Sequence, residues 1–164
     1  MSAYITLLTP MTDQECLLAG LVELGFSQTM VEVHASPVPL VGYRGDQRAN
    51  VASIVIRRQH VGPGSNDVGF VRTPTGFQAI VSDFDRPRFG NDWLATLNAA
   101  YTNHWTAKQE RLAAEERRRV EEERQRLVEA QRQSVLAKAR ELGYQVKESR
   151  EGDAIRLVLV KRTY

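Results

Sequence analysis

Two carboxylates in a polar loop are the residues of this sequence best placed to do chemistry. Asp83 and Asp85 stand two positions apart and are followed by Arg86 and Arg88. Paired carboxylates bind Mg²⁺ or share a proton, and metal-dependent hydrolysis uses both properties. The neighbouring arginines favour a different interpretation, in which they neutralise the carboxylates within a structural turn. A divalent-metal-dependent hydrolase therefore stays as an alternative function.

The other reactive side chains are scattered. The three histidines, His34, His60 and His104, share no metal-ligand spacing with one another or with Cys16. Cys16 lies among leucines at helical spacing, which predicts a buried structural thiol rather than a nucleophile. We expect no catalytic residue, no metal and no cofactor, and a chain that is not an enzyme.

Three residues next to predicted strands form a candidate recognition site. They are Tyr43, Arg44 and Asp67. Polar residues in turns that a rigid sheet positions often carry binding. The alternative is structural: Tyr43 packs against the protein, and Arg44 forms an ion pair with Asp67.

Arginine-rich segments raise a second alternative, binding to nucleic acid. The candidates are Arg57, Arg58, Arg72 and the run of Arg117, Arg118 and Arg119. A formal net charge of +2 is small for a protein that binds a polyanion. Glutamates also flank the arginine run, so nucleic-acid binding is not favoured.

The first half of the chain predicts the elements that must position these residues. A helix with Thr12 or Asp13 as its N-cap and Gly25 after its end follows a first strand. Loops are expected at 62–67 and 83–90. The predicted strands are Ala3–Thr9, Met30–His34, Val51–Ile56, Asp67–Val71 and Phe77–Val81. Hairpins rather than strict alternation of strand and helix indicate an α+β fold with a small, mainly antiparallel sheet and one short helix.

A long charged helix is the most distinctive prediction. The stretch from Asn91 to Leu142 contains no Gly and no Pro. Its middle carries a single apolar column, Ala113, Val120 and Leu127, seven residues apart. One column is too thin for a strong coiled coil, although a weak helical hairpin or dimer seam remains open. The exposed candidates for interaction on this arm are Arg117, Arg118, Arg119, Val120 and Leu127.

A C-terminal β-hairpin completes the predicted organisation. Its strands are Tyr144–Glu148 and Ile155–Lys161, with a turn at Gly152-Asp153. An isolated two-stranded hairpin is marginally stable, so it needs a cover from its own head or from another copy. We therefore expect a head over 1–92, a helical arm over 93–142 and a hairpin over 143–164, with a homodimer or higher oligomer forming through the arm.

The composition and the chain start bear on location. The Met1 end shows no basic segment followed by an apolar one, as a secretory signal would. No apolar run reaches the length that a bilayer requires. We expect a cytoplasmic protein with no membrane partner.

Several short motifs resemble a known family. They are Tyr43-Arg44-Gly45, the strand Ala52–Ile56, Asp67-Val68-Gly69-Phe70, Leu97-Asn98-x-x-Tyr101, Ala139-x-x-Leu142-Gly143-Tyr144 and the ending Ile155–Leu159. In this order they are similar to the plastid and cyanobacterial family called hypothetical chloroplast frame thirty-five. The chain differs by about 30 intervening charged residues, judged against the helical pitch.

The resemblance implies a role rather than a reaction, because the family has no known function. Its bacterial members tend to be encoded beside AAA-type ATPases and a small partner protein. By analogy we expect a non-enzymatic protein-interaction or assembly module, accessory to a larger complex that includes an AAA-type ATPase.

Overall fold

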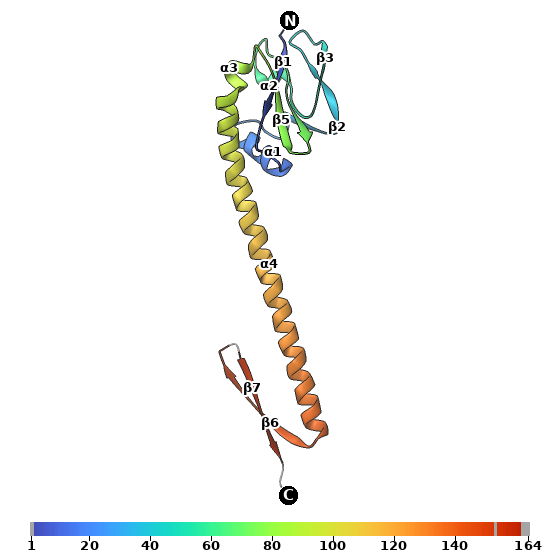
Figure 1. The fold of residues 1–164 in the computed structure, drawn as a ribbon, viewed down its shortest axis with the longest axis vertical. Coiled ribbons are helices and arrows are strands. Elements are labelled where there is room, and N and C mark those ends of the chain that lie inside the picture. Colours follow the sequence, from blue (N-terminus) through green and yellow to red (C-terminus); the bar gives the residue numbers. More distant parts are fainter. Residues whose placement is uncertain (1, 153, 162–164) are drawn as a thin grey trace. The chain divides into compact units, whose positions relative to one another are not determined.

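The computed structural model describes residues 2–152 and 154–161. The chain divides into unit 1, Met1–Glu110, and unit 2, Arg111–Tyr164, with the boundary inside one helix. The elements (Figure 1) are β1 (Tyr4–Leu8), α1 (Gln14–Glu23), β2 (Val31–Val41), β3 (Gln47–Ile56), α2 (Arg58–Val61), β4 (Val68–Thr73), β5 (Gly76–Ser82), α3 (Arg86–Phe89), α4 (Asn91–Glu141), β6 (Tyr144–Glu151) and β7 (Ala154–Lys161).

A five-stranded sheet forms the centre of unit 1. Its order is β1-β5-β4-β3-β2, and each neighbouring pair is antiparallel. The edge strand β2 contains Pro37 and Pro39, and its register with β3 shifts between Val33 and Val38. Proline lacks the N–H that an interior strand must donate, so an edge is the position where a sheet accepts it. The predicted α+β fold with a mainly antiparallel sheet is confirmed.

The hydrophobic core of unit 1 lies on both faces of this sheet. On one face, side chains of β3, β4 and β5 pack with Leu17 and Leu21 of α1 and with Leu97 and Tyr101 of α4. On the other face a smaller cluster gathers Leu40, Ala52, Val55 and Ile80. Alternation along β4 and β5 divides their side chains between the two clusters, whereas in β3 the division changes at Ala52, where the register with β2 shifts.

Hydrogen bonds fasten α4 to the start of α1. The Asp13 carboxylate caps α1 by accepting from the backbone N–H of Cys16 at 2.9 Å, which confirms the predicted cap. The Tyr101 hydroxyl accepts from the backbone N–H of Asp13 at 3.1 Å. Lys108 Nζ donates to the Asp13 and Glu15 carboxylates at 2.8 and 2.7 Å. The first turns of α4 are therefore part of unit 1.

The long helix is continuous. Helix α4 begins at Asn91 and runs for 51 residues without interruption, so the helical-hairpin alternative does not occur. It ends before Gly143, whose φ of 75° is a left-handed conformation that favours glycine.

Two four-residue helices, α2 and α3, were not predicted. Helix α3 lies in the segment expected to be a loop, and α2 begins directly after β3. Segments this short cannot display a helical period, which explains the error. Pro87 in the first turn of α3 was the available signal, because proline suits that position.

Strands β6 and β7 form a separate two-stranded antiparallel sheet. Its register runs from Tyr144 opposite Lys161 to Glu151 opposite Ala154, so β6 extends three residues beyond the predicted end at Glu148. Of the predicted turn, Gly152 is described and Asp153 lies outside the described residues. The hairpin prediction is confirmed.

Candidate interaction surface

The hairpin of unit 2 has two different faces. Directly opposed residues of an antiparallel pair share a face. The pairs Val146–Leu159 and Glu148–Leu157 therefore lie on one face, here called the inner face, together with Ile155. The pair Lys147–Val158 lies on the other, the outer face, as does Val160.

Helix α4 contacts the inner face through an ion pair. Arg132 donates from Nε and Nη2 to the two carboxylate oxygens of Glu148, at 2.9 and 2.7 Å. Its Nη1 also donates to Glu129 at 2.9 Å. The guanidinium group holds the pKa of Glu148 below its usual range. This forked contact fixes which face of the hairpin meets the helix.

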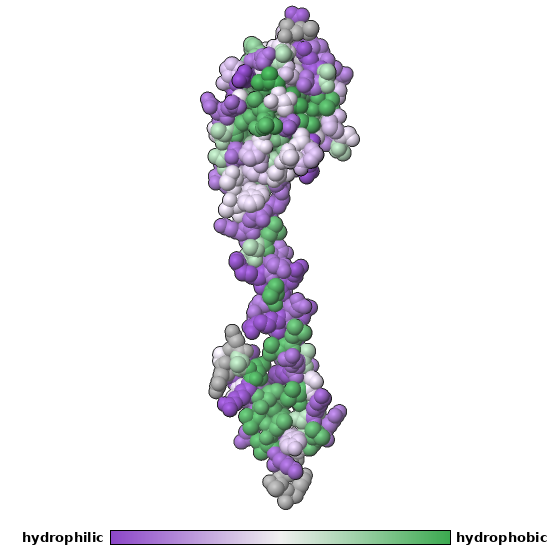
Figure 2. All heavy atoms as spheres, in the orientation of Figure 1, coloured by the Kyte–Doolittle hydropathy of each residue, from purple (hydrophilic) through white to green (hydrophobic). Residues whose placement is uncertain are grey.

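Unit 2 buries very little. Among its residues whose exposure is described, only Ala139 is buried. Both hydrophobic clusters of the described chain belong to unit 1. The exposed large apolar side chains of unit 2 are Leu112, Val120, Leu127, Val128, Val135, Leu142, Val158, Leu159 and Val160. Figure 2 shows hydrophobic atoms gathered over the hairpin, with isolated ones along α4 between charged side chains.

The predicted arm residues lie together on α4, within unit 2. Val120 and Leu127 are 56% and 60% exposed. Arg119 forms an ion pair with Glu116 at 2.8 Å, and Arg118 lies 3.7 Å from Glu122. Arg117 is also exposed. Ion pairs within the helix keep this segment helical without burial, each contributing about 0.2–0.5 kcal/mol.

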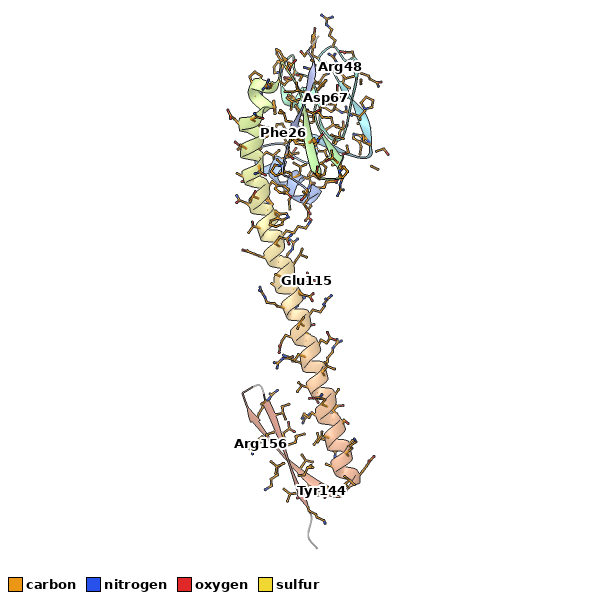
Figure 3. The ribbon with its side chains drawn as sticks, viewed as in Figure 1. Phe26, Arg48, Asp67, Glu115, Tyr144 and Arg156 are labelled. Atoms are coloured by element: carbon orange, nitrogen blue, oxygen red, sulfur yellow. The ribbon has the colours of Figure 1, made fainter. Side chains whose placement is uncertain are left out.

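The predicted recognition site of unit 1 is only partly at the surface. Tyr43 and Arg44 are exposed, with the Arg44 guanidinium 5.2 Å from the Tyr43 ring centre. Asp67 is fully buried and pairs with Arg57 at 2.9 Å. The alternative of an ion pair between Arg44 and Asp67 is therefore wrong, and Figure 3 shows Asp67 inside unit 1.

Asp67 has a structural role. Its carboxylate accepts from the backbone N–H groups of Val41 and Arg58, at 2.8 and 2.7 Å. Its carbonyl accepts from the Tyr4 hydroxyl at 3.1 Å. Burial and the nearby Asp67 charge raise the pKa of Tyr4. The carboxylate thus ties β2 to the start of α2, and Arg57 balances its charge.

Three of the arginines proposed for nucleic acid, Arg57, Arg58 and Arg72, have partners within unit 1. Arg57 Nε donates to Glu32 at 2.8 Å, in addition to its pair with Asp67. Arg58 donates to the carbonyl of Tyr43. The Arg72 guanidinium lies 5.7 Å from the Phe77 ring centre. Arg57 in particular is committed to two carboxylates.

The two loop carboxylates differ. Asp83 is exposed, whereas Asp85 is buried. The Asp85 carboxylate accepts a hydrogen bond from the backbone N–H of Asn66 at 2.9 Å and another from the Ser82 hydroxyl at 2.5 Å. Burial alone would raise the pKa of Asp85, but the hydrogen bonds from Ser82 and Asn66 outweigh it and lower that pKa. Within residues 2–152 and 154–161, no three His, Cys, Asp or Glu side chains are grouped as metal ligands.

The hairpin residues of the uncovered surface were not singled out from the sequence. The signal was the unbroken apolar run Leu157–Val160. In a strand such a run places apolar side chains on both faces, and a two-stranded sheet cannot cover both.

The remaining findings concern the chain as a whole. In the part of the chain that the structure describes, no helix combines the length and the hydrophobicity that crossing a bilayer requires. No protein-family model, curated protein or solved structure matches this sequence.

Proposed function

We propose that this protein is a non-enzymatic assembly module that associates with other protein chains through unit 2. The observation that supports the proposal is the contrast between the units. Unit 1 has a filled core on both sheet faces, whereas unit 2 leaves most of its described large apolar side chains exposed. Exposed apolar patches on a folded element mark sites of protein association.

The energetics favour association through several side chains at once. Burying one large apolar side chain contributes about 1.5–3 kcal/mol. Association itself costs about 4–15 kcal/mol in lost freedom of motion. A partner must therefore cover several side chains, and β7 offers Val158 and Val160 on its outer face and Leu159 on its inner face.

The chemistry of unit 1 supports a non-enzymatic role. Buried ionisable groups are the usual starting point for a catalytic site. Here the buried carboxylates Asp67 and Asp85 each accept hydrogen bonds from backbone N–H groups and side chains of the fold. These bonds tie both carboxylates to the surrounding fold, through both oxygens of Asp67 and through Oδ2 of Asp85.

The identity of the larger complex is proposed on a different ground. Membership of an assembly that contains an AAA-type ATPase rests on the resemblance of the sequence motifs to the hypothetical chloroplast frame thirty-five family. Association of the chain with itself rests on the uncovered surface of unit 2.

The test is a pair of matched substitutions in the full chain. Leu159→Asp, on the inner face of β7, is expected to reduce association at least tenfold in sedimentation equilibrium and to reduce recovery of copurifying protein. Leu8→Asp, on β1 of unit 1, replaces an equally apolar exposed residue and should leave both unchanged. A wild-type chain that stays monomeric at high concentration and retains no protein partner would refute the proposal.

A further inference from the structure

The two open edges of the hairpin differ in chemistry. Strands β6 and β7 pair only with each other in the described chain, so each has one edge whose backbone groups pair with no strand. Strand β6 reads YQVKESRE and β7 reads AIRLVLVK. Charged residues on an edge strand hinder pairing with another strand. The β6 edge is protected in this way, while the central part of β7, Leu157–Val160, is uncharged.

The same hairpin needs more strands. A two-stranded sheet is marginal in water, and three or more strands with an apolar face are required for stability. Leu159 on the inner face is 49% exposed even though α4 lies on that face. Additional strands beside β7 would extend the apolar inner face. The protein segments attached to those strands would help to cover that face.

We propose that β7 pairs antiparallel with β7 of a second copy of this chain, forming a four-stranded sheet with the order β6-β7-β7-β6. This inference rests on the proposed function and names the partner for it. A second copy fits because a two-fold axis can pass between the two Leu157 residues, perpendicular to the sheet. Directly opposed residues share a face, so the inner faces of both hairpins lie on the same side of the four-stranded sheet.

The register follows from side-chain matching. With Leu157 opposite Leu157 of the second copy, Ile155 lies opposite Leu159, so the inner-face residues at positions 155, 157 and 159 meet only apolar residues of the second copy. A shift of the axis to Val158 would instead place Lys161 opposite Ile155. On the outer face the chosen register places Arg156 opposite Val158 of the second copy.

The parallel alternative is disfavoured by charge. In a parallel, in-register pair, Arg156 would face Arg156. Like charges directly opposite one another destabilise a sheet. The antiparallel arrangement separates these arginines on either side of the axis.

The first experiment changes charge at Val158 and measures association by sedimentation equilibrium. Val158→Lys places a lysine opposite Arg156 of the second copy and should weaken self-association at least tenfold. Within one hairpin Lys147 also opposes position 158, so this effect alone is ambiguous. Adding Arg156→Glu removes the repulsion between copies but leaves Lys147 in place. The double variant should recover most of the wild-type association, and absence of recovery would overturn the inference.

The second experiment reads the register directly. Ala154 lies opposite Val160 of the second copy in the proposed pairing. Full-length Ala154→Cys and Val160→Cys variants, mixed and oxidised by oxidised glutathione, should form a disulfide between the two different variants and little between identical ones. The wild-type chain, whose Cys16 is buried, is the control. Disulfides between identical variants, or none, would exclude the antiparallel pairing.

The outcomes separate the two proposals. A chain that associates through unit 2 with a different protein, or that docks β7 on a strand of unit 1, keeps the assembly function but fails the register experiment. A chain with no association of any kind fails both.

Discussion

Buried carboxylates in this protein organise loops. Asp67 and Asp85 lie 18 positions apart in the sequence, and the neighbouring Asn66 joins them: its backbone N–H donates to Asp85, and its side-chain oxygen accepts from the N–H of Tyr43 at 3.1 Å. Asn66 thus links the 62–67 loop to the 83–90 loop and to the turn at Tyr43, while the buried Ser65 Oγ and Asp85 Oδ1 have no hydrogen-bond partner among the described residues. Leaving a buried donor such as the Asn66 N–H without its acceptor costs about 1–3 kcal/mol.

Removal of the Asp85 carboxylate is expected to destabilise unit 1. Asp85→Ala leaves the backbone N–H of Asn66 and the Ser82 hydroxyl without an acceptor, so the free energy of unfolding should fall by about 3 kcal/mol. Urea unfolding followed by tryptophan fluorescence measures this, since Trp93 and Trp105 both belong to unit 1. Asp83→Ala, in the same loop but exposed, should change stability by less than about 0.5 kcal/mol.

The same carboxylate predicts a pH dependence. The pKa of Asp85 is lower in the folded chain than its ordinary value of 3.8. The unfolded state therefore binds its proton first, and the stabilisation is complete above pH 3.8 and declines as pH falls through the lower folded value. Wild type should lose this contribution on acidification, and Asp85→Ala should lack it. Equal acid sensitivity in the two chains would contradict the assignment.

At the scale of elements, the centre of the sheet depends on a missing side chain. Gly69 of β4 lies opposite Val55 of β3. A Cβ at position 69 would lie 2.5 Å from the Ala52 Cβ and 2.9 Å from Leu40 Cδ2, both in the smaller core cluster. Real atoms do not approach so closely, and the packed sheet leaves little room to relax. The glycine allows β2, β3 and β4 to close over this cluster.

Gly69→Ala should therefore cost about 1–3 kcal/mol through overpacking. Ala52→Gly removes the nearest atom, so the double variant should lose clearly less stability than the sum of the two single variants. Denaturant titration of all four chains completes the cycle. Strict additivity would mean that positions 52 and 69 do not collide.

Helix α4 shows how one element can serve both units. Its first turns carry Leu94, Leu97 and Tyr101 into the core of unit 1, whereas from Arg111 onward its residues are mostly exposed. Glu–Arg pairs such as Glu121–Arg124, at 2.9 Å, stabilise the exposed part locally. The helix therefore persists where no core supports it.

At the scale of the whole molecule, the two units differ in how their stability arises. Unit 1 encloses its own core. Unit 2 has one buried residue among those whose exposure is described, Ala139, and its hairpin is held to α4 by the Arg132–Glu148 pair. If association supplies the missing cover, as proposed, the stability of unit 2 should depend on chain concentration.

Hydrogen exchange tests this difference within one sample. Amides of β3, β4 and β5 should be protected equally at low and high concentration. Amides of β6 and β7 should exchange rapidly when the chain is dilute and become protected, by at least tenfold, as the concentration rises. Strong protection of β6 and β7 at every concentration would show that unit 2 is stable alone.

Much of the fold could be predicted because its signals are local. The N-cap at Asp13, the left-handed Gly143 and the absence of Gly and Pro through α4 each act within a few residues. The partner of Asp67 could not be predicted in the same way. From the sequence, either Arg44 or Arg57 could turn toward Asp67. Only the packing of β2 against β3 and α2 decides that Arg57 reaches the Asp67 carboxylate.

The sequence by itself determined the longer α+β elements, the continuous charged helix and the need of a small hairpin for a cover, because hydrophobic period, caps and turn residues are written along the chain. The tertiary structure alone decided which carboxylates are buried, and that β6 and β7 pair only with each other in the described chain. Burial and strand order depend on contacts between segments distant in sequence, and no local pattern specifies them.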